Sequence, residues 1–333
     1  MNRILVTGGA GFIGSHVVDA LIEMGQDVTV LDDLSGGARE NLHPRAGFVL
    51  GSVTDHQLVR SLFQVAKFSH VFHLAAYAAE GLSSFIKRFN YNNNLIGSVN
   101  LLNAAITYGA KRVVFTSSIA VYGSQPCPMT EEMIPMPVDS YGIAKYAVER
   151  ELAVCQQMFG LEYVIFRPHN VFGERQNLGD RYRNVVGIFM NQLMKGDPLT
   201  IFGDGEQTRA FTYVGDVAPV IARSAFVPQA RNQIFNIGAD QPLTVNHLSQ
   251  LVAEAMGVPA VVRHVPSREE VHHAYCSHAK IEALLGYAAK TPVSEGLRRM
   301  AAWAKAHGAR QTASFGEIEI LKNLPSVWLE KAS

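Results

Sequence analysis

Short runs of apolar residues recur along the first half of the chain, and a segment with helical periodicity follows most of them. Rich in Val, Ile and Phe, these runs predict strands that are buried on both faces of a sheet. The expected strands are residues 3–7, 27–31, 70–75, 112–117 and 163–168, with helices at residues 14–25 and 94–110 between them. This alternation predicts an α/β fold with a Rossmann-type doubly wound parallel sheet.

The pattern becomes less regular after residue 170. We expect helices at residues 185–195, 214–226, 244–256 and 294–306, separated by longer polar loops. We therefore divide the chain into a doubly wound domain, residues 1–170, and a smaller mixed α/β region, residues 171–333. We expect the second region mainly to bind a substrate, with some of its segments returning to the first domain. The last 25 or so residues show no pattern that would place them.

Composition excludes several classes of function. The chain of 333 residues has 29 basic and 29 acidic side chains, so nothing suggests a nucleic-acid partner. Its three cysteines are widely spaced, which predicts neither a disulfide framework nor a metal site. No apolar stretch reaches the ~18–20 residues that cross a bilayer, and the first strand leaves no room for a signal peptide. We expect a cytoplasmic protein with no membrane partner.

A glycine-rich turn connects the first expected strand to the first helix. In "TGGAGFIG" (7–14), Gly8, Gly11 and Gly14 leave room for a pyrophosphate to approach the start of the helix. An acidic residue follows at the expected distance, because Asp32 ends the second strand. Asp32 can accept hydrogen bonds from ribose hydroxyls, and its charge would repel the extra phosphate of NADP. The sequence therefore predicts NAD as the cofactor.

A serine, a tyrosine and a lysine have the positions needed for proton transfer next to that cofactor. Ser118 follows the fourth strand, whereas Tyr141 and Lys145 are four residues apart at the start of a helix and share one face of it. A free tyrosine has a pKa of about 10. We expect the lysine ammonium and the positive nicotinamide to lower the pKa of Tyr141. Tyr141 would then accept a proton from a sugar hydroxyl held by Ser118.

Taken together, these motifs resemble the extended short-chain dehydrogenases/reductases that act on nucleotide sugars. The resemblance covers nearly the whole chain, and its marks are "TGGAGFIG" (7–14), "HLAA" (73–76), "TSSIAVYG" (116–123), "YGIAK" (141–145), "RPHNVFG" (167–173), "FGDGEQTRAFTYVGDV" (202–217) and "FNIG" (235–238). Family members that dehydrate or decarboxylate the sugar carry acidic residues just before "VYG". Ile119 and Ala120 stand there in this chain and cannot exchange protons.

The resemblance therefore implies a homodimeric enzyme similar to UDP-glucose 4-epimerase, which oxidises and re-reduces C4 of a UDP-sugar through a 4-keto intermediate. By the same resemblance, the cofactor-binding residues are Gly8, Gly11, Phe12, Ile13, Gly14, Asp32, Ser52, Val53, Leu74, Ala75, Ala76, Asn94, Tyr141 and Lys145. The substrate-binding residues are Ala78, Ser118, Tyr141, His169, Asn170, Arg209, Ala274 and Arg268. The dimer would form through residues 83–108 and 141–158.

Some of these positions depart from the family pattern. Ser52 replaces an aspartate that usually holds adenine, Ala78 stands near a lysine of many UDP-galactose epimerases, and His169 replaces an aromatic residue. His169 is interpreted either as a polar contact to the sugar or, with twice the weight, as a packed ring.

The choice of sugar stays open. A small residue at Ala274 would admit N-acetyl sugars, whereas Tyr275, one position later, would exclude them. Arg181 or Arg183 could bind the carboxylate of a uronic acid and make the protein a UDP-glucuronate 4-epimerase.

Two further classes are a net nucleotide-sugar oxidoreductase and a non-catalytic NAD-binding regulator. The histidines at 272, 273 and 278 are expected at the surface or the pocket rim without a metal, and Cys276 is expected to be inert.

Overall fold

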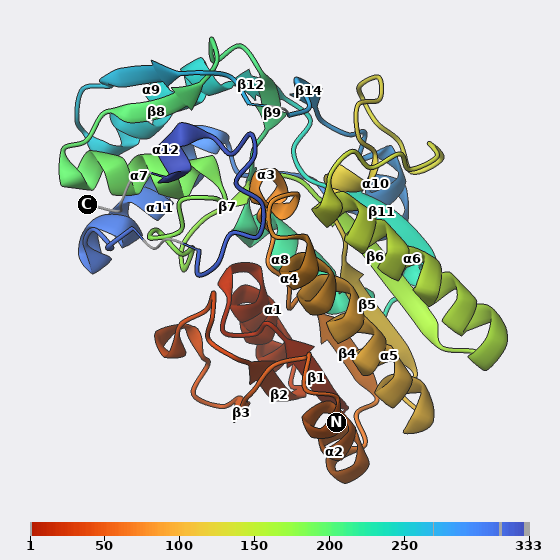
Figure 1. Cartoon of the computed structure of the whole chain (residues 1–333). Coiled ribbons are helices and arrows are strands. Elements are labelled where there is room, and N and C mark those ends of the chain that lie inside the picture. Colours follow the sequence, from red (N-terminus) through yellow and green to blue (C-terminus); the bar gives the residue numbers. More distant parts are fainter. Residues whose placement is uncertain (1, 269, 313–314, 330–333) are drawn as a thin grey trace.

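The computed structural model describes residues 2–268, 270–312 and 315–329. Its centre is a seven-stranded sheet in the order β11-β6-β5-β4-β1-β2-β3, and every pairing in it is parallel. The expected doubly wound α/β fold is confirmed (Figure 1). The strands are β1 (Arg3–Thr7), β2 (Asp27–Asp32), β3 (Gly47–Leu50), β4 (His70–His73), β5 (Arg112–Thr116), β6 (Glu162–Pro168) and β11 (Gln233–Ile237).

Helices cover both faces of this sheet, and the alternation of side chains along each strand explains why the strands are apolar throughout. In β1, Ile4 and Val6 belong to the core under α1 and α8, whereas Leu5 belongs to the core under α2, α5 and α6. These helices are α1 (Phe12–Glu23), α2 (His56–Ala66), α5 (Gly97–Thr107), α6 (Ser140–Phe159) and α8 (Val214–Ser224), with α10 (Ala279–Leu285) on the face of α1 and α8.

The helix expected at residues 94–110 is divided in the structure. Residues Lys87–Tyr91 form α4, Asn92–Ile96 form a π-helical segment, and Gly97–Thr107 form α5. Asn94 lies in the π-helical segment, where its side chain pairs with the backbone of Tyr77 through hydrogen bonds of 2.9 and 3.1 Å. π-Helical segments are rare and often occur at functional sites. This one holds the chain that follows β4.

The smaller region packs its own core around three helices, α7 (Val185–Lys195), α9 (Val245–Met256) and α11 (Val293–His307). These positions agree with the helices expected from the sequence. Three small sheets complete this region: β7 (Val171–Phe172) with β10 (Thr212–Tyr213); β8 (Leu199–Phe202) with β13 (Val262–Val265); and β9 (Thr208–Ala210) between β12 (Pro242–Thr244) and β14 (His273–Ala274).

Residues 315–329, part of the C-terminal segment in which no sequence pattern was found, pack beside the short helix α3 (Glu80–Ser83) and α4 (Figure 1). The Phe315 ring lies 4.9 Å from that of Phe89, and the Glu319 carboxylate accepts hydrogen bonds of 2.9 Å from the backbone N–H groups of Arg88 and Phe89. Trp328, in α12 (Ser326–Leu329), is buried. This segment therefore supports the loop that follows β4.

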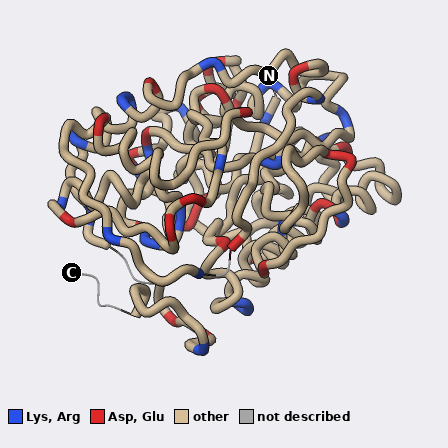
Figure 2. The backbone as a smooth tube through the Cα atoms, turned by 90° about the horizontal axis from the view of Figure 1, so that it is seen from above, with Lys and Arg blue, Asp and Glu red and all other residues tan. Residues whose placement is uncertain are grey.

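Lysine and arginine residues alternate with aspartate and glutamate over the molecule (Figure 2). Within the described residues, no helix is long and apolar enough to cross a membrane. The same residues contain no group of three or more His, Cys, Asp or Glu side chains that could hold a metal ion.

Candidate functional site

A cavity of about 840 Å³ runs from the glycine turn, past the carboxyl ends of β4 and β5, to the loops of the smaller region. This is the edge at which doubly wound sheets bind ligands, and the size is typical of ligand sites. Of the residues assigned from the sequence, the cavity is lined by Gly8, Gly11, Phe12, Ile13, Gly14, Asp32, Ser52, Val53, Leu74, Ala75, Ala76, Ala78, Ser118, Tyr141, Lys145, His169, Asn170, Arg209 and Arg268.

The glycine turn forms a close cradle at one end of the cavity. Gly8 has a φ of +74°, and a Cβ on Gly14 would lie 2.0 Å from the Gly8 carbonyl oxygen. Helix α1 begins at Phe12 after Gly11, which offers no side-chain cap, so the first N–H groups of the helix are available to an anionic ligand. The turn thus has the shape that a pyrophosphate needs.

Asp32 lies at the end of β2, beside this cradle. Its carboxylate accepts hydrogen bonds from the backbone N–H groups of Ala10 (3.0 Å) and Leu34 (2.8 Å). Burial raises the pKa of Asp32, while these backbone hydrogen bonds lower it. The hydroxyl group of Ser52 already has a partner within the protein, because it accepts a hydrogen bond of 3.0 Å from the Thr54 hydroxyl.

The catalytic candidates meet at the carboxyl end of β5. Tyr141 is buried at the start of α6, and its hydroxyl is close enough to the Ser118 side chain for that group to lower its pKa. Lys145, one turn later, donates a hydrogen bond of 2.8 Å from Nζ to the Thr116 carbonyl oxygen. Its ammonium lies 5.7 Å from the centre of the Tyr141 ring. Asp139 begins α6 by accepting a 2.8 Å hydrogen bond from the backbone N–H of Gly142.

Burial is the largest influence on the protonation of both Tyr141 and Lys145. The pKa of Tyr141 is raised above its ordinary value by burial, and the hydrogen bond to Ser118 opposes this effect. Burial also lowers the pKa of Lys145 to about 7, although the charge of Glu149 raises it. Tyr141 therefore needs a positive charge beside it before it can act as a base at neutral pH.

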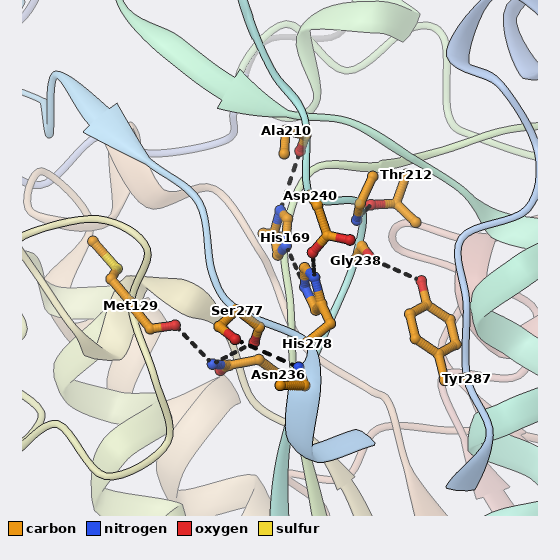
Figure 3. Close-up of polar contacts among 12 residues, drawn as sticks. Met129, His169, Ala210, Thr212, Asn236, Gly238, Asp240, Ser277, His278 and Tyr287 are labelled. Carbon is orange, nitrogen blue, oxygen red and sulfur yellow. Dashed lines mark hydrogen bonds and ion pairs between the residues drawn. The ribbon is translucent and has the colours of Figure 1, made fainter. Parts of the chain in front are cut away.

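His169 follows β6 at the cavity wall. Both of its ring nitrogens already have hydrogen-bond partners within the protein (Figure 3). Nδ1 donates a 3.1 Å hydrogen bond to the Ala210 carbonyl oxygen, and Nε2 lies 3.0 Å from Nε2 of His278. His278 in turn pairs with Asp240 at 2.6 Å. Burial lowers the pKa of His169 to about 3, which leaves the ring neutral. The geometry thus agrees with the packed-ring interpretation.

The structure places four other residues differently from the expectation. His278 is buried and does not lie at the surface or the rim. Ala274 is buried in β14, where it pairs with Arg209 of β9, and Tyr275 lines a separate small groove. Neither of these two lines the large cavity, and this placement removes the basis for the proposed N-acetyl gate. Asn94 also does not line it, because it braces Tyr77 from behind.

Cys276 is buried, and burial raises the pKa of its thiol. A protonated buried thiol is unreactive, as expected.

Several arginines surround the far end of the cavity. Arg209 donates to the backbone carbonyl oxygens of Thr208 and His272, at 2.9 Å each. Arg268 forms a 3.0 Å ion pair with Glu270. Arg183 is held by Asp180 at 2.6 Å. The side chain of Arg181 donates to the Val327 carbonyl oxygen, and Arg181 does not line the cavity.

Sequence reasoning missed several residues at this site, above all Glu80 and Asp139, which line the cavity, and Glu149 behind it. Glu80 follows the apolar run after "HLAA", where a charged side chain at a strand's carboxyl end was a usable signal.

Comparison with known proteins agrees with this geometry. A family model described as the NAD-dependent epimerase/dehydratase family matches residues 4–238. The chain belongs to this family. It is 34% identical over 305 residues to the UDP-glucose 4-epimerase of Mycolicibacterium smegmatis, covering 89% of this chain and 96% of that protein.

Solved structures of the family superpose on nearly the whole chain. The UDP-glucose 4-epimerase of Thermotoga maritima, solved with UDP-glucose, has a TM-score of 0.87 and 38% identity, covering 92% of this chain and 99% of that one. The UDP-glucuronic acid 4-epimerase of Bacillus cereus, solved with UDP-glucuronic acid and NAD, has a TM-score of 0.85 and 27% identity, with the same coverage.

Proposed function

We propose that this family member is an NAD-dependent 4-epimerase of a UDP-sugar, with UDP-glucose and UDP-galactose as its first candidate pair. One observation carries the proposal. Ser118, Tyr141 and Lys145 line the same cavity as the glycine cradle, whereas the side chains that follow Ser118, Ile119 and Ala120, are hydrocarbons. The machinery for oxidation and reduction at one carbon is therefore present, without the acid–base pair of a dehydratase at those positions.

The residues fit NAD as the cofactor. A Cβ on Gly8 would lie 2.6 Å from the backbone nitrogen of Ala75, so only glycine leaves room for the turn. Asp32 ends β2, the strand that pairs with β1 before the glycine turn, as expected for a residue that binds ribose hydroxyls. When bound, NAD supplies the acceptor and donor of the two electrons. We propose that residues 1–170 hold NAD and that residues 171–333 mainly hold the UDP-sugar.

The side chains of the protein would move one proton in each half of the cycle. The Ser118 hydroxyl holds the 4-hydroxyl of the sugar, and the Tyr141 phenolate oxygen takes its proton and later returns it. Because burial raises the pKa of Tyr141, the phenolate needs a positive neighbour. Lys145 supplies one charge, which Glu149 supports by raising the pKa of that amine, and the bound nicotinamide supplies the other.

The experiment incubates the purified protein, without added cofactor, separately with UDP-glucose, UDP-N-acetylglucosamine and UDP-glucuronate. Proton NMR follows the configuration at C4. Formation of the 4-epimer without added NAD supports an epimerase that retains its cofactor. Stoichiometric consumption of added NAD would instead indicate a net oxidoreductase. No conversion of any of the three, even with NAD, would reject the epimerase proposal for these sugars and return attention to a non-catalytic NAD-binding role.

We further propose a homodimer formed through α5 and α6, which pack side by side. The outer surface of these helices exposes apolar side chains of α6 and of the π-helical segment before α5, namely Ile96, Ile143, Val154, Met158 and Phe159. Light scattering during size-exclusion chromatography tests the proposal, and replacing Met158 and Phe159 by aspartate should yield monomers.

The three free thiols support a reducing, cytoplasmic compartment.

A further inference from the structure

Glu80 is a charged side chain in the wall of the large cavity that the proposed reaction does not use. It begins α3, two residues after Ala78, and lines the cavity together with Gly81 and Ser84. Its neighbours Ala79 and Leu82 are 1% and 0% exposed and belong to the apolar cluster that contains Trp328. Glu80 itself is exposed. The buried side of α3 therefore directs Glu80 toward the cavity.

A single hydroxyl group fixes Glu80 relative to the catalytic tyrosine. The Oγ of Ser83 donates a 2.7 Å hydrogen bond to the backbone carbonyl oxygen of Glu80 and accepts a 3.1 Å hydrogen bond from the backbone N–H of Tyr141. The two residues are also close enough for their charges to interact, since the Glu80 carboxylate contributes to raising the pKa of Tyr141. Glu80 thus lies at the end of the cavity where the reacting sugar carbon would be.

The carboxylate of Glu80 lacks a partner in the protein. Within the described part of the chain, no hydrogen bond or ion pair reaches its oxygens. The nearby cations Arg209 and Arg268 are 3.6 and 3.0 Å from Glu270 instead. An ionised carboxylate accepts hydrogen bonds only, at about four lone-pair positions, so a ligand with several hydroxyl groups would satisfy it.

We propose that Glu80 is a specificity-determining residue of the sugar pocket, which accepts hydrogen bonds from the hydroxyl groups of a neutral hexose and excludes a hexuronate. The inference rests on the proposed function, because it assumes a UDP-sugar in this cavity. The carboxylate of a uronate would lie in the same cavity as the unpaired negative charge of Glu80. Two like charges placed together in this way strongly disfavour binding.

The cations of the cavity do not offset this repulsion. Arg183, which could have received a uronate, already forms an ion pair with Asp180 at 2.6 Å. Around Glu80, the positive charges of Arg209 and Arg268 are opposed by the negative charges of Asp139 and Glu270. The local balance therefore leaves the charge of Glu80 uncompensated.

The protonation of Glu80 offers an independent test. Water reaches the Glu80 side chain through the cavity, but the protein that surrounds it still raises the pKa of its carboxyl group to about 7 by desolvation, with a smaller contribution from Asp139. A carboxyl group with this pKa is neutral below pH 7 and ionised above it, whereas a hexuronate stays ionised at both. The discrimination by Glu80 against a hexuronate should therefore weaken as the pH falls through about 7.

Isothermal titration of the NAD-loaded protein with UDP-glucose and UDP-glucuronate measures the ratio of their dissociation constants. At about pH 8 the wild type should bind UDP-glucose roughly tenfold or more tightly than UDP-glucuronate, and at about pH 6 this ratio should shrink. In Glu80→Gln the ratio should be within about threefold and independent of pH. Glu80→Asp should restore the exclusion, and the surface variant Glu254→Gln should match the wild type.

Three results would overturn the assignment, and they can be told apart. If the wild type epimerises UDP-glucose but Glu80→Gln leaves the ratio unchanged, Glu80 has no role in specificity while the proposed function stands. If the wild type binds neither compound, the proposed function and the assignment both fall. Equal binding of the two compounds by the wild type at pH 8 rejects the exclusion directly.

Discussion

The guanidinium of Arg167 lies 2.6 Å from the carboxylate of Glu149, and both side chains are only 2% exposed. Glu149 also accepts a 2.5 Å hydrogen bond from Ser117, and Arg167 donates a 2.7 Å hydrogen bond to the Tyr122 hydroxyl. The pair thereby connects α6, which carries Tyr141, to β6 and to the loop after β5. Helix α6 and the loop after β5 supply the catalytic candidates, so we interpret this network as the frame that positions them.

Replacing Glu149 by glutamine should strongly destabilise the fold. It leaves the buried charge of Arg167 without a counterion, which costs about 3–5 kcal/mol. Urea-induced unfolding measures the change in the free energy of unfolding. Glu295→Gln is the control, because Glu295 pairs with Arg299 at the surface and such pairs contribute less than about 1 kcal/mol. Equal losses in the two variants would show that burial of the Glu149 pair has no special effect.

The glycine cradle predicts that Gly14→Ala impairs cofactor binding. The new Cβ would lie 2.0 Å from the Gly8 carbonyl oxygen, so the turn must open and its N–H groups move away from the pyrophosphate. We expect the affinity for NAD, measured by titration of cofactor-free protein, to fall by roughly tenfold or more, about 1.4 kcal/mol. Gly47→Ala is the matched control, since its Cβ would have an ordinary contact of 3.5 Å. An unchanged affinity in Gly14→Ala would refute the cradle.

Tyr141→Phe removes the group that transfers the proton while keeping the ring. The rate of C4 epimerisation, followed by NMR, should fall by roughly 10²–10⁴, the contribution typical of general acid–base catalysis. Substrate affinity should change little because the ring remains. Tyr163→Phe, at a position outside the cavity lining, should retain the wild-type rate. If Tyr141→Phe retained it as well, another group would have to move the proton.

The buried amine of Lys145 predicts a pH-dependent stability. Its pKa is lowered by burial from 10.5 to about 7, so the unfolded chain binds this proton more tightly than the folded protein. The resulting destabilisation is fully present below pH 7, at roughly 3–5 kcal/mol, and is lost as the pH rises toward 10. Lys145→Met should therefore be more stable than the wild type at low pH, with the difference narrowing at high pH.

Unfolding of cofactor-free protein at several pH values measures that difference. Lys305→Met, on the exposed end of α11, controls for the general effect of removing a positive charge. A difference between Lys145→Met and the wild type that stays constant with pH would contradict the assignment of the shift to Lys145.

Local sequence determined the strands β1, β2, β4, β5 and β6, the glycine turn and the helices α7, α9 and α11, whereas the strand β3 (Gly47–Leu50) was not predicted. The strand at residues 3–7 agrees in full with β1, and the helix at residues 185–195 agrees with α7. Both depend on periodicity and on turn residues that lie next to one another in the chain. The proximity of Ser118, Tyr141 and Lys145 could also be predicted from the sequence, because strand ends at one edge of a parallel sheet must be neighbours.

Tertiary packing decided what periodicity does not encode. The strand β11 joins the sheet from beyond residue 230, and His278 reaches His169 across more than 100 residues to be buried rather than exposed. The orientation of Glu80 and the protonation of Tyr141 and Lys145 depend on which segments cover them, including the C-terminal residues that pack near α3. Burial and electrostatic interactions arise between segments distant in the sequence, so the sequence alone specified the reacting groups, and the folded structure set their charges and their exposure.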